Sequence, residues 1–205
     1  MKIELVLEIF ITLMIMIDPP GVIAPYLSLT SKMNEVEKKV VLYQATLFSG
    51  LLLIGSIFLG HSILNLLGIS TFALQIAGGI LIFKFGYEIM NDKMREVDAD
   101  ESPGLFPIGF PLIAGPGSIT AIIVITSSKE IISTKVIDVL IVSIIVLVVL
   151  FFTFIFLKYG SQIMDKLGKK ASSTIIKLNA LLILTIGIQM ILTGINQWIY
   201  LTFYL

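Results

Sequence analysis

The sequence has no cysteine, a single histidine and few charged residues among its 205 residues. Without cysteine the chain cannot form disulfides, thiolate metal sites or cysteine nucleophiles. One histidine and no H-E-x-x-H motif leave no zinc site or nucleophile–base pair, and no P-loop points to ATP. Lysine plus arginine and aspartate plus glutamate number 14 each, with no basic tract for nucleic acid. We therefore expect neither an enzyme nor a cofactor, metal or nucleic-acid partner.

Hydrophobic residues dominate the chain instead. They make up 57% of it, charged residues make up 14%, and the mean hydropathy is +1.02, which is far from the composition of a usual soluble domain. The apolar residues form several runs of about 20 residues, long enough for a helix to cross ~30 Å of hydrocarbon. No small-residue cleavage site follows the first run, so we expect this run to be retained as a span. The sequence predicts an all-α polytopic protein in a lipid bilayer.

Six apolar segments are predicted to cross the membrane, separated by connections that hold most of the charge. They lie near residues 3–30, 39–60, 69–90, 105–127, 136–158 and 174–204. The connections SKMNEVEKK, NDKMREVDADESPG and KYGSQIMDKLGKKASS are polar, whereas the second connection, around Gly60-His61-Ser62, is short and nearly uncharged. We expect one membrane domain over residues 1–205.

The fourth segment repeats the first. IAGPGSITAIIVITS from Ile113 aligns without gaps on IDPPGVIAPYLSLTS from Ile17, at an offset of 96, with six of fifteen residues identical. The third and sixth segments match more loosely, as GGILIFKFGYEIM from Gly78 and NALLILTIGIQMI from Asn179. The chain is therefore predicted to contain two copies of a three-helix unit. The first repeat covers residues 1–92, a cytoplasmic connection covers 93–104, and the second repeat covers 105–205.

The odd number of spans in each copy determines how the copies are related. After three crossings the second copy enters the membrane from the opposite side, which predicts inverted repeats about an axis in the membrane plane. The first, third and fifth connections hold nine lysines and arginines, against three on the other side. Because positive residues favour the cytoplasm, we expect a multi-pass protein of the cell (inner) membrane with both termini outside.

Two proline–glycine motifs are expected to break the first helix of each repeat. They are Asp18-Pro19-Pro20-Gly21 and Gly115-Pro116-Gly117, and proline lacks a backbone donor while glycine readily leaves helical geometry. Backbone groups freed inside lipid must be satisfied by protein, water or a ligand, so the breaks should face a cavity. The positive start of each following half-helix favours an anion such as a substrate carboxylate. The alternative is that each motif is only a packing kink.

The predicted substrate site lies between these half-helices, near the membrane midplane. Asp18 could cap its half-helix, bind a substrate ammonium, or carry a coupling proton or sodium ion. Ser118 and Thr120 could contact the ligand or return hydrogen bonds to the freed backbone. Asn179 could form a wall of the site or join two helices. The candidate substrate-binding residues are Asp18, Pro20, Gly21, Val22, Gly115, Gly117, Ser118, Ile119, Thr120 and Asn179.

Other polar and small residues in the spans receive structural interpretations. Gln75 and Gln189 are expected to hydrogen-bond between helices. Lys84 and Glu88, four residues apart, are expected to pair near the cytoplasmic end of their helix. Gly78, Gly79 and Gly86 predict close helix packing, and His61 is expected at the membrane interface.

Three sequence blocks resemble the signature blocks of the MarC family. They are D-P-P-G-x-x-x-P-Y-L-x-L-T from Asp18, L-G-I-S-x-x-A-L-x-I-A-G-G-I-L from Leu67, and F-P-L-I-A-G-P-G-S-I-T from Phe110. That family includes archaeal members called SnatA, small neutral amino acid transporters. The resemblance implies a six-helix inner-membrane protein of the wider lysine-exporter-like group, which carries glycine, alanine and similar amino acids with help from an ion gradient. Pro20 replaces the residue often seen in D-P-x-G and leaves the break intact.

Two functions from different classes follow. The leading hypothesis is secondary transport of small neutral amino acids, driven by a proton or sodium gradient, with no other cofactor. The alternative is a channel or exporter for an ion or an unknown small metabolite, although the sequence has no rings of charge or repeated carbonyl filter. A homo-oligomer, the coupling ion and the direction of flow stay open.

Overall fold

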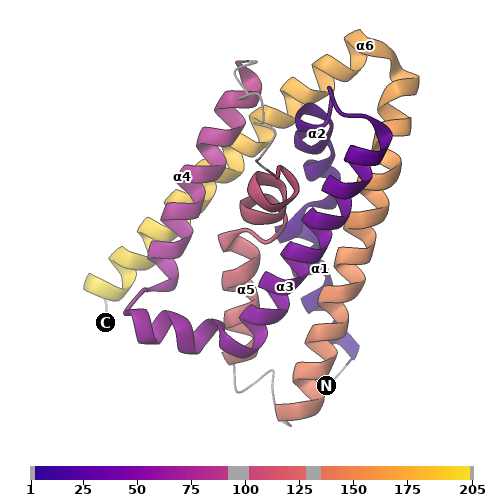
Figure 1. The fold of residues 1–205 in the computed structure, drawn as a ribbon. Helices are drawn as coiled ribbons and strands as arrows, with labels where there is room; N and C mark the ends of the chain where they lie inside the picture. Colours follow the sequence, from indigo (N-terminus) through magenta and orange to yellow (C-terminus); the bar gives the residue numbers. More distant parts are fainter. Residues whose placement is uncertain (1–2, 92–101, 128–134, 204–205) are drawn as a thin grey trace.

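The computed structural model describes residues 3–91, 102–127 and 135–203, and this part of the chain is all-helical (Figure 1). The segment labelled η1 has π-type turns interrupted at Phe106 and Phe110, whose backbone angles are extended rather than helical. The side chains of His61 and Asn179 lie outside the described residues. In chain order the helices are α1 (Ile3–Ile17), α2 (Pro19–Leu29), α3 (Glu35–Leu67), α4 (Thr71–Met90), η1 (Gly104–Ile113), α5 (Pro116–Ser127) and α6 (Lys135–Phe203).

The described helices contain five stretches long and apolar enough to cross a membrane. A sixth is obtained when η1 and α5, which meet at an angle of 53°, are counted as one bent span. The six predicted apolar segments therefore agree with the structure, and most of their boundaries differ from the observed ones by only a few residues. The five stretches are Ile3–Leu29, Glu35–Gly60, Thr71–Met90, Val136–Gly160 and Ala180–Phe203.

Two predicted connections are helical in the structure. The predicted polar link between the last two spans belongs to α6, which bends over at the top of Figure 1 and descends again. We call Val136–Gly160 its first arm and Ala180–Phe203 its second arm. The link has no proline to end the helix. Similarly, α3 continues past Gly60 to Leu67 and ends at Gly68, whose φ of 63° suits glycine.

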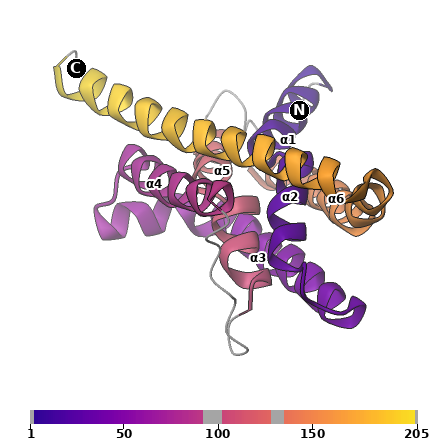
Figure 2. The ribbon, with the colours of Figure 1, turned by 90° about the horizontal axis from the view of Figure 1, so that it is seen from above.

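The helices pack around two apolar clusters. The larger cluster joins α1, α2, α3, η1, α5 and the first arm of α6, and includes the fully buried Leu13, Leu53 and Leu157. The smaller one lies between α4 and the second arm, around Phe85 and Ile183. Figures 1 and 2 show α4 beside this arm, and α5 between α4 and the pair α1–α2.

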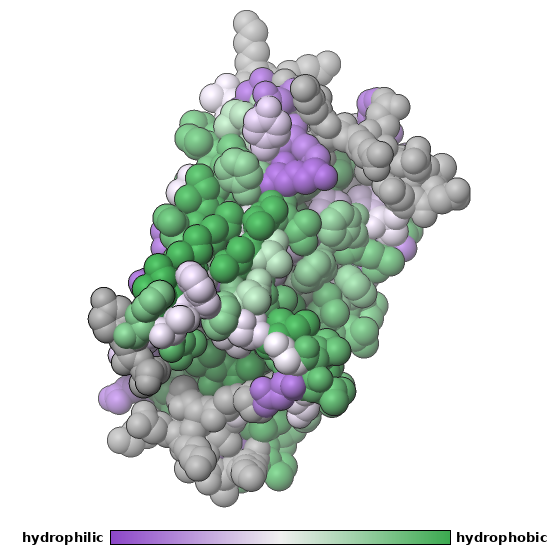
Figure 3. Space-filling view, turned by 90° about the vertical axis from the view of Figure 1, so that its left-hand side faces the viewer, coloured by the Kyte–Doolittle hydropathy of each residue, from purple (hydrophilic) through white to green (hydrophobic). Residues whose placement is uncertain are grey.

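The outer surface is apolar across its middle. Figure 3 shows one face on which hydrophobic residues cover the centre while hydrophilic residues lie toward the two ends. Large side chains such as Leu47, Ile144 and Leu181 are more than half exposed. A surface of this kind suits contact with lipid tails, as the composition predicts.

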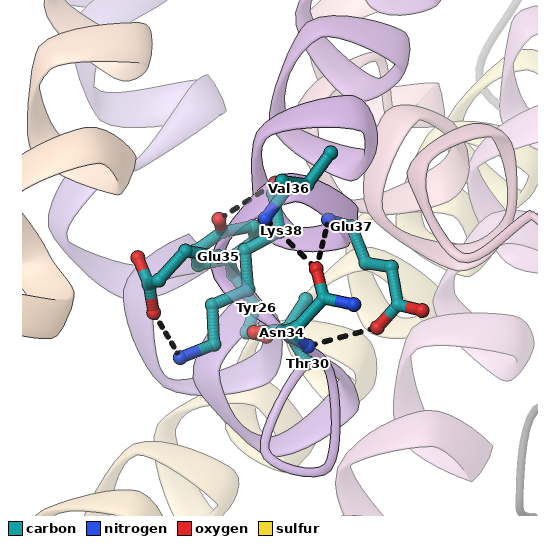
Figure 4. Close-up of polar contacts among 7 residues, drawn as sticks. All are labelled: Tyr26, Thr30, Asn34, Glu35, Val36, Glu37 and Lys38. Atoms are coloured by element: carbon teal, nitrogen blue, oxygen red, sulfur yellow. Dashed lines mark hydrogen bonds and ion pairs between the residues drawn. The ribbon is translucent and has the colours of Figure 1, made fainter.

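The connection between α2 and α3 is fixed by polar contacts (Figure 4). Asn34 caps α3, because its Oδ1 accepts the N–H groups of Val36 at 2.9 Å and Glu37 at 3.0 Å. In return, Glu37 Oε2 accepts the Asn34 N–H at 2.8 Å, which completes a capping box. The Tyr26 hydroxyl donates to the Lys38 carbonyl at 3.0 Å and ties α2 to the start of α3.

Candidate functional site

A cavity of about 310 Å³ lies where the ends of several helices meet. Its walls come from α1, α2, α4, η1, α5 and the second arm of α6, so both proline–glycine motifs border it. Most lining side chains are apolar, and Asp18 is the one charged residue among the described residues that line it. The lining residues are Ile15, Met16, Ile17, Asp18, Gly21, Val22, Gln75, Ile82, Pro111, Leu112, Gly115, Gly117, Ser118, Ile183, Ile186, Gln189, Met190 and Thr193.

Asp18 alone separates α1 from α2. Its φ of 46° and ψ of 64° place it in the left-handed region, which costs a non-glycine residue roughly 1–3 kcal/mol. Pro19 and Pro20 have no N–H, and the Asp18 Oδ1 accepts the N–H of Gly21 at 3.2 Å. The N-cap interpretation of Asp18 is therefore confirmed. The side chain also borders the cavity, so capping leaves it available to face a ligand.

Gly21 is required by this cap rather than by its own backbone angles. A Cβ atom at residue 21 would overlap the carboxylate of Asp18. The motif thus holds the acid close to the start of α2, where a larger residue would push it away.

The second interruption lies at Ala114 and Gly115, between η1 and α5. The Ser118 hydroxyl donates to the carbonyl of Gly115 at 2.9 Å and is also 3.2 Å from that of Ile113. Of the two roles proposed for Ser118, the structure shows the second, in which its hydroxyl hydrogen-bonds to the freed backbone. The N–H groups of Gly117 and Ser118 stand at the start of α5, where a helix provides no internal partners.

Six of the ten predicted binding residues line the cavity. They are Asp18, Gly21, Val22, Gly115, Gly117 and Ser118. Pro20 is exposed, and Ile119 and Thr120 are outside the lining. The Thr120 hydroxyl is buried and has no hydrogen-bond partner among the described residues. The side chain of Asn179 falls outside those residues, so its role stays a prediction.

Neither glutamine shows the predicted link between helices among the described residues. Gln189 Nε2 donates to Thr193 Oγ1 at 3.3 Å, within α6 itself. Gln75 Oε1 is buried and has no partner among the described residues, which typically costs about 1–3 kcal/mol. Both glutamines line the cavity, as does Met190. Their polarity within apolar runs was visible in the sequence, but the face that each one presents depends on how α4 and α6 pack.

Glycines bring α4 close to its neighbours, as predicted. A Cβ at Gly78 would overlap the ring of Pro116, the first residue of α5. One at Gly79 would lie 2.7 Å from the Gly187 carbonyl oxygen, and one at Gly86 would lie 2.9 Å from the Leu184 nitrogen. This close approach places the cavity side of α4 beside the start of α5.

The remaining charged pair of α4 lies away from the cavity. Lys84 Nζ is 4.0 Å from Glu88 Oε1, and Lys84 is exposed while Glu88 is half-buried. The predicted pairing is confirmed. Within residues 3–91, 102–127 and 135–203, no three histidine, cysteine, aspartate or glutamate residues come together as a metal site.

The chain matches a family model described as "MarC family integral membrane protein" over residues 3–199. The chain belongs to the MarC family. It is 29% identical to the UPF0056 membrane protein YvbG of Bacillus subtilis, over 96% of each chain. It is also 29% identical to a UPF0056 membrane protein of Archaeoglobus fulgidus, over 92% of this chain and 91% of the relative. No solved structure matches this MarC-family chain.

Proposed function

We propose that this MarC-family protein is a secondary transporter that carries small neutral amino acids, such as glycine and alanine, across the cell membrane. A proton or sodium gradient drives the movement. The observation that carries the proposal is that both helix interruptions border one and the same cavity. Its volume of about 310 Å³ is at the low end of the ~300–1,000 Å³ of small-molecule sites, which favours a small ligand.

The lining suits the two charges of an amino acid. The substrate carboxylate lies at the start of α5, where the N–H groups of Gly117 and Ser118 and the helix dipole favour an anion. Asp18 provides the negative partner for the ammonium group or for a coupling cation. The remaining walls are largely apolar, which favours an uncharged side chain.

The arrangement of the spans supports alternating access. In this proposal, α1 to α4 form one three-span unit, and η1 to the end of α6 form a second, inverted unit. The interruptions at Asp18 and at Ala114–Gly115 are then equivalent positions of the two units. Rocking of one unit against the other opens the midplane site to each side in turn. Both termini lie outside the cell, and the membrane is the inner membrane where a second one exists.

Uptake of labelled glycine and alanine into proteoliposomes tests the function. Proton and sodium gradients are imposed separately and compared with no gradient, and excess unlabelled amino acid is added as a chase. Saturable accumulation above equilibrium with one gradient is expected, and it identifies the coupling ion. Downhill, non-saturable flux would favour a channel instead, and no movement of either amino acid would reject this substrate class.

A further inference from the structure

The amide of Gln75, near the start of α4, is a polar group of the cavity that the proposed function does not use. Its Oε1 is buried without a hydrogen-bond partner among the described residues. Two other amides in the spans are partnered, since Gln44 Oε1 accepts the Ser102 hydroxyl and Gln189 Nε2 donates to Thr193 Oγ1. Buried amide oxygens in proteins are normally satisfied. Gln75 therefore lacks a donor, which a ligand in the adjoining cavity can supply.

The position of Gln75 places it next to the start of α5. It precedes Gly78 by three residues, about 4.5 Å along the helix axis. Gly78 lies against the ring of Pro116, the first residue of α5. Gln75, Gly117 and Ser118 all line the same cavity. A small molecule whose anionic group sits at the start of α5 therefore shares its cavity with the Gln75 amide.

The lining contributes acceptors and donors from different elements. The Asp18 carboxylate and the Gln75 carbonyl accept hydrogen bonds, whereas the first N–H groups of α5 donate them. One Asp18 oxygen already accepts the N–H of Gly21 at 3.2 Å. An ammonium group can donate three hydrogen bonds, and the Asp18 carboxylate, which already accepts one from Gly21, does not have to accept all of them. The unpartnered oxygen of Gln75 is a further acceptor in the lining.

We propose that Gln75 Oε1 accepts a hydrogen bond from the ammonium group of the transported amino acid, beside Asp18. The inference rests on the proposed function and deepens it. The last torsion of a glutamine side chain is broad, so the amide turns toward the ligand at little cost. Asp18 then recognises the positive charge, while Gln75 recognises the N–H bond. Amines without N–H bonds are selected against even when they keep the charge.

Methylation of the ligand nitrogen separates these two contributions. Betaine, the N-trimethyl derivative of glycine, keeps both charges of glycine but has no N–H. Dissociation constants for glycine and betaine are measured by calorimetry on the purified protein, for wild type and Gln75→Met. The variant keeps the side-chain length without the carbonyl. Because betaine is bulkier than glycine in both proteins, the ratio of the two constants is compared between proteins rather than either constant alone.

Wild type is expected to prefer glycine over betaine by about 10- to 100-fold more than Gln75→Met does. Gln75→Glu, which keeps acceptor oxygens, is expected to retain the wild-type preference. Gln44→Met removes an amide outside the cavity and serves as the control, with the wild-type ratio. Equal ratios in wild type and Gln75→Met would overturn the inference and leave the proposed function standing. A wild type that binds neither glycine nor alanine would reject both.

Discussion

Asp18 combines a structural and a functional role, and two substitutions separate them. Replacement by asparagine would keep the cap, because asparagine is as good an N-cap as aspartate and tolerates left-handed backbone. We expect Asp18→Asn to unfold near the wild-type temperature but to lose most gradient-driven uptake. Asp18→Ala removes the cap as well and should cost about 0.5–2 kcal/mol of stability. Thermal unfolding in detergent and uptake by proteoliposomes measure the two effects, and coupled uptake by Asp18→Asn at the wild-type rate would contradict the functional role.

The absence of a side chain at Gly117 leaves space in the cavity beside the start of α5. A Cβ there would lie 3.6 Å from the Met16 sulfur and 3.8 Å from the Met190 methyl carbon, which are ordinary contacts. We therefore expect Gly117→Ala to fold normally and to lose affinity for alanine roughly tenfold more than for glycine, since one methyl group fills part of the pocket. Gly117→Val should abolish binding of both. Competition of each amino acid against labelled glycine measures these affinities, and an unchanged pair of constants in Gly117→Val would place the site elsewhere.

At the scale of elements, α4 and the second arm of α6 can pack closely because glycines, which have no side chain, lie where they meet. A Cβ at Gly187 would lie 2.7 Å from the Phe83 nitrogen and 2.8 Å from the Gly79 carbonyl oxygen. Because backbone atoms cannot move aside cheaply, Gly187→Ala should lower stability by about 1–3 kcal/mol. Gly55, in α3, is the matched control, since a Cβ there meets nothing within 4 Å.

Gly55→Ala is expected to stabilise α3 by roughly 0.5–1 kcal/mol, because alanine loses less backbone entropy in a helix than glycine. Unfolding temperatures of the two variants in the same detergent test the contrast. Equal shifts of the unfolding temperature in both variants would show that the close approach of α4 and α6 contributes nothing to stability.

The elements also show which parts of the fold the sequence can predict. Long apolar runs predict spans because hydropathy is a local property, and the ranges agree closely. The positions of Asp18 and Gly115 follow from local chemistry too, since proline and glycine restrict or free their own backbone. The sequence predicts a connection where α6 is helical, because the residues there are polar. Polar residues indicate exposure to water, but they do not by themselves end a helix. That Gln75 lines the cavity could not be predicted, because the face it presents depends on packing against α5 and α6, which no single segment encodes.

At the scale of the whole molecule, the helix ends and connections lie at two opposite ends of the structure. In Figure 1, α1 begins and α6 ends toward the lower end, together with the α3–α4 connection, whereas the α2–α3 connection lies toward the upper end. The nine-to-three excess of lysine and arginine predicts that the α2–α3 side faces the cytoplasm. An inverted arrangement of two three-span units requires this separation, because each unit must cross an odd number of times.

The absence of cysteine makes the wild-type chain a ready background for testing this topology. Single cysteines are placed at exposed positions as Ser31→Cys, Ile69→Cys and Thr202→Cys. In intact cells expressing each variant, a membrane-impermeant maleimide should label Ile69→Cys and Thr202→Cys, and should reach Ser31→Cys only after permeabilisation. Labelling of Ile69→Cys and Thr202→Cys from opposite sides would mean that the second unit crosses an even number of times. Inverted repeats, and alternating access built on them, would then be excluded for this chain.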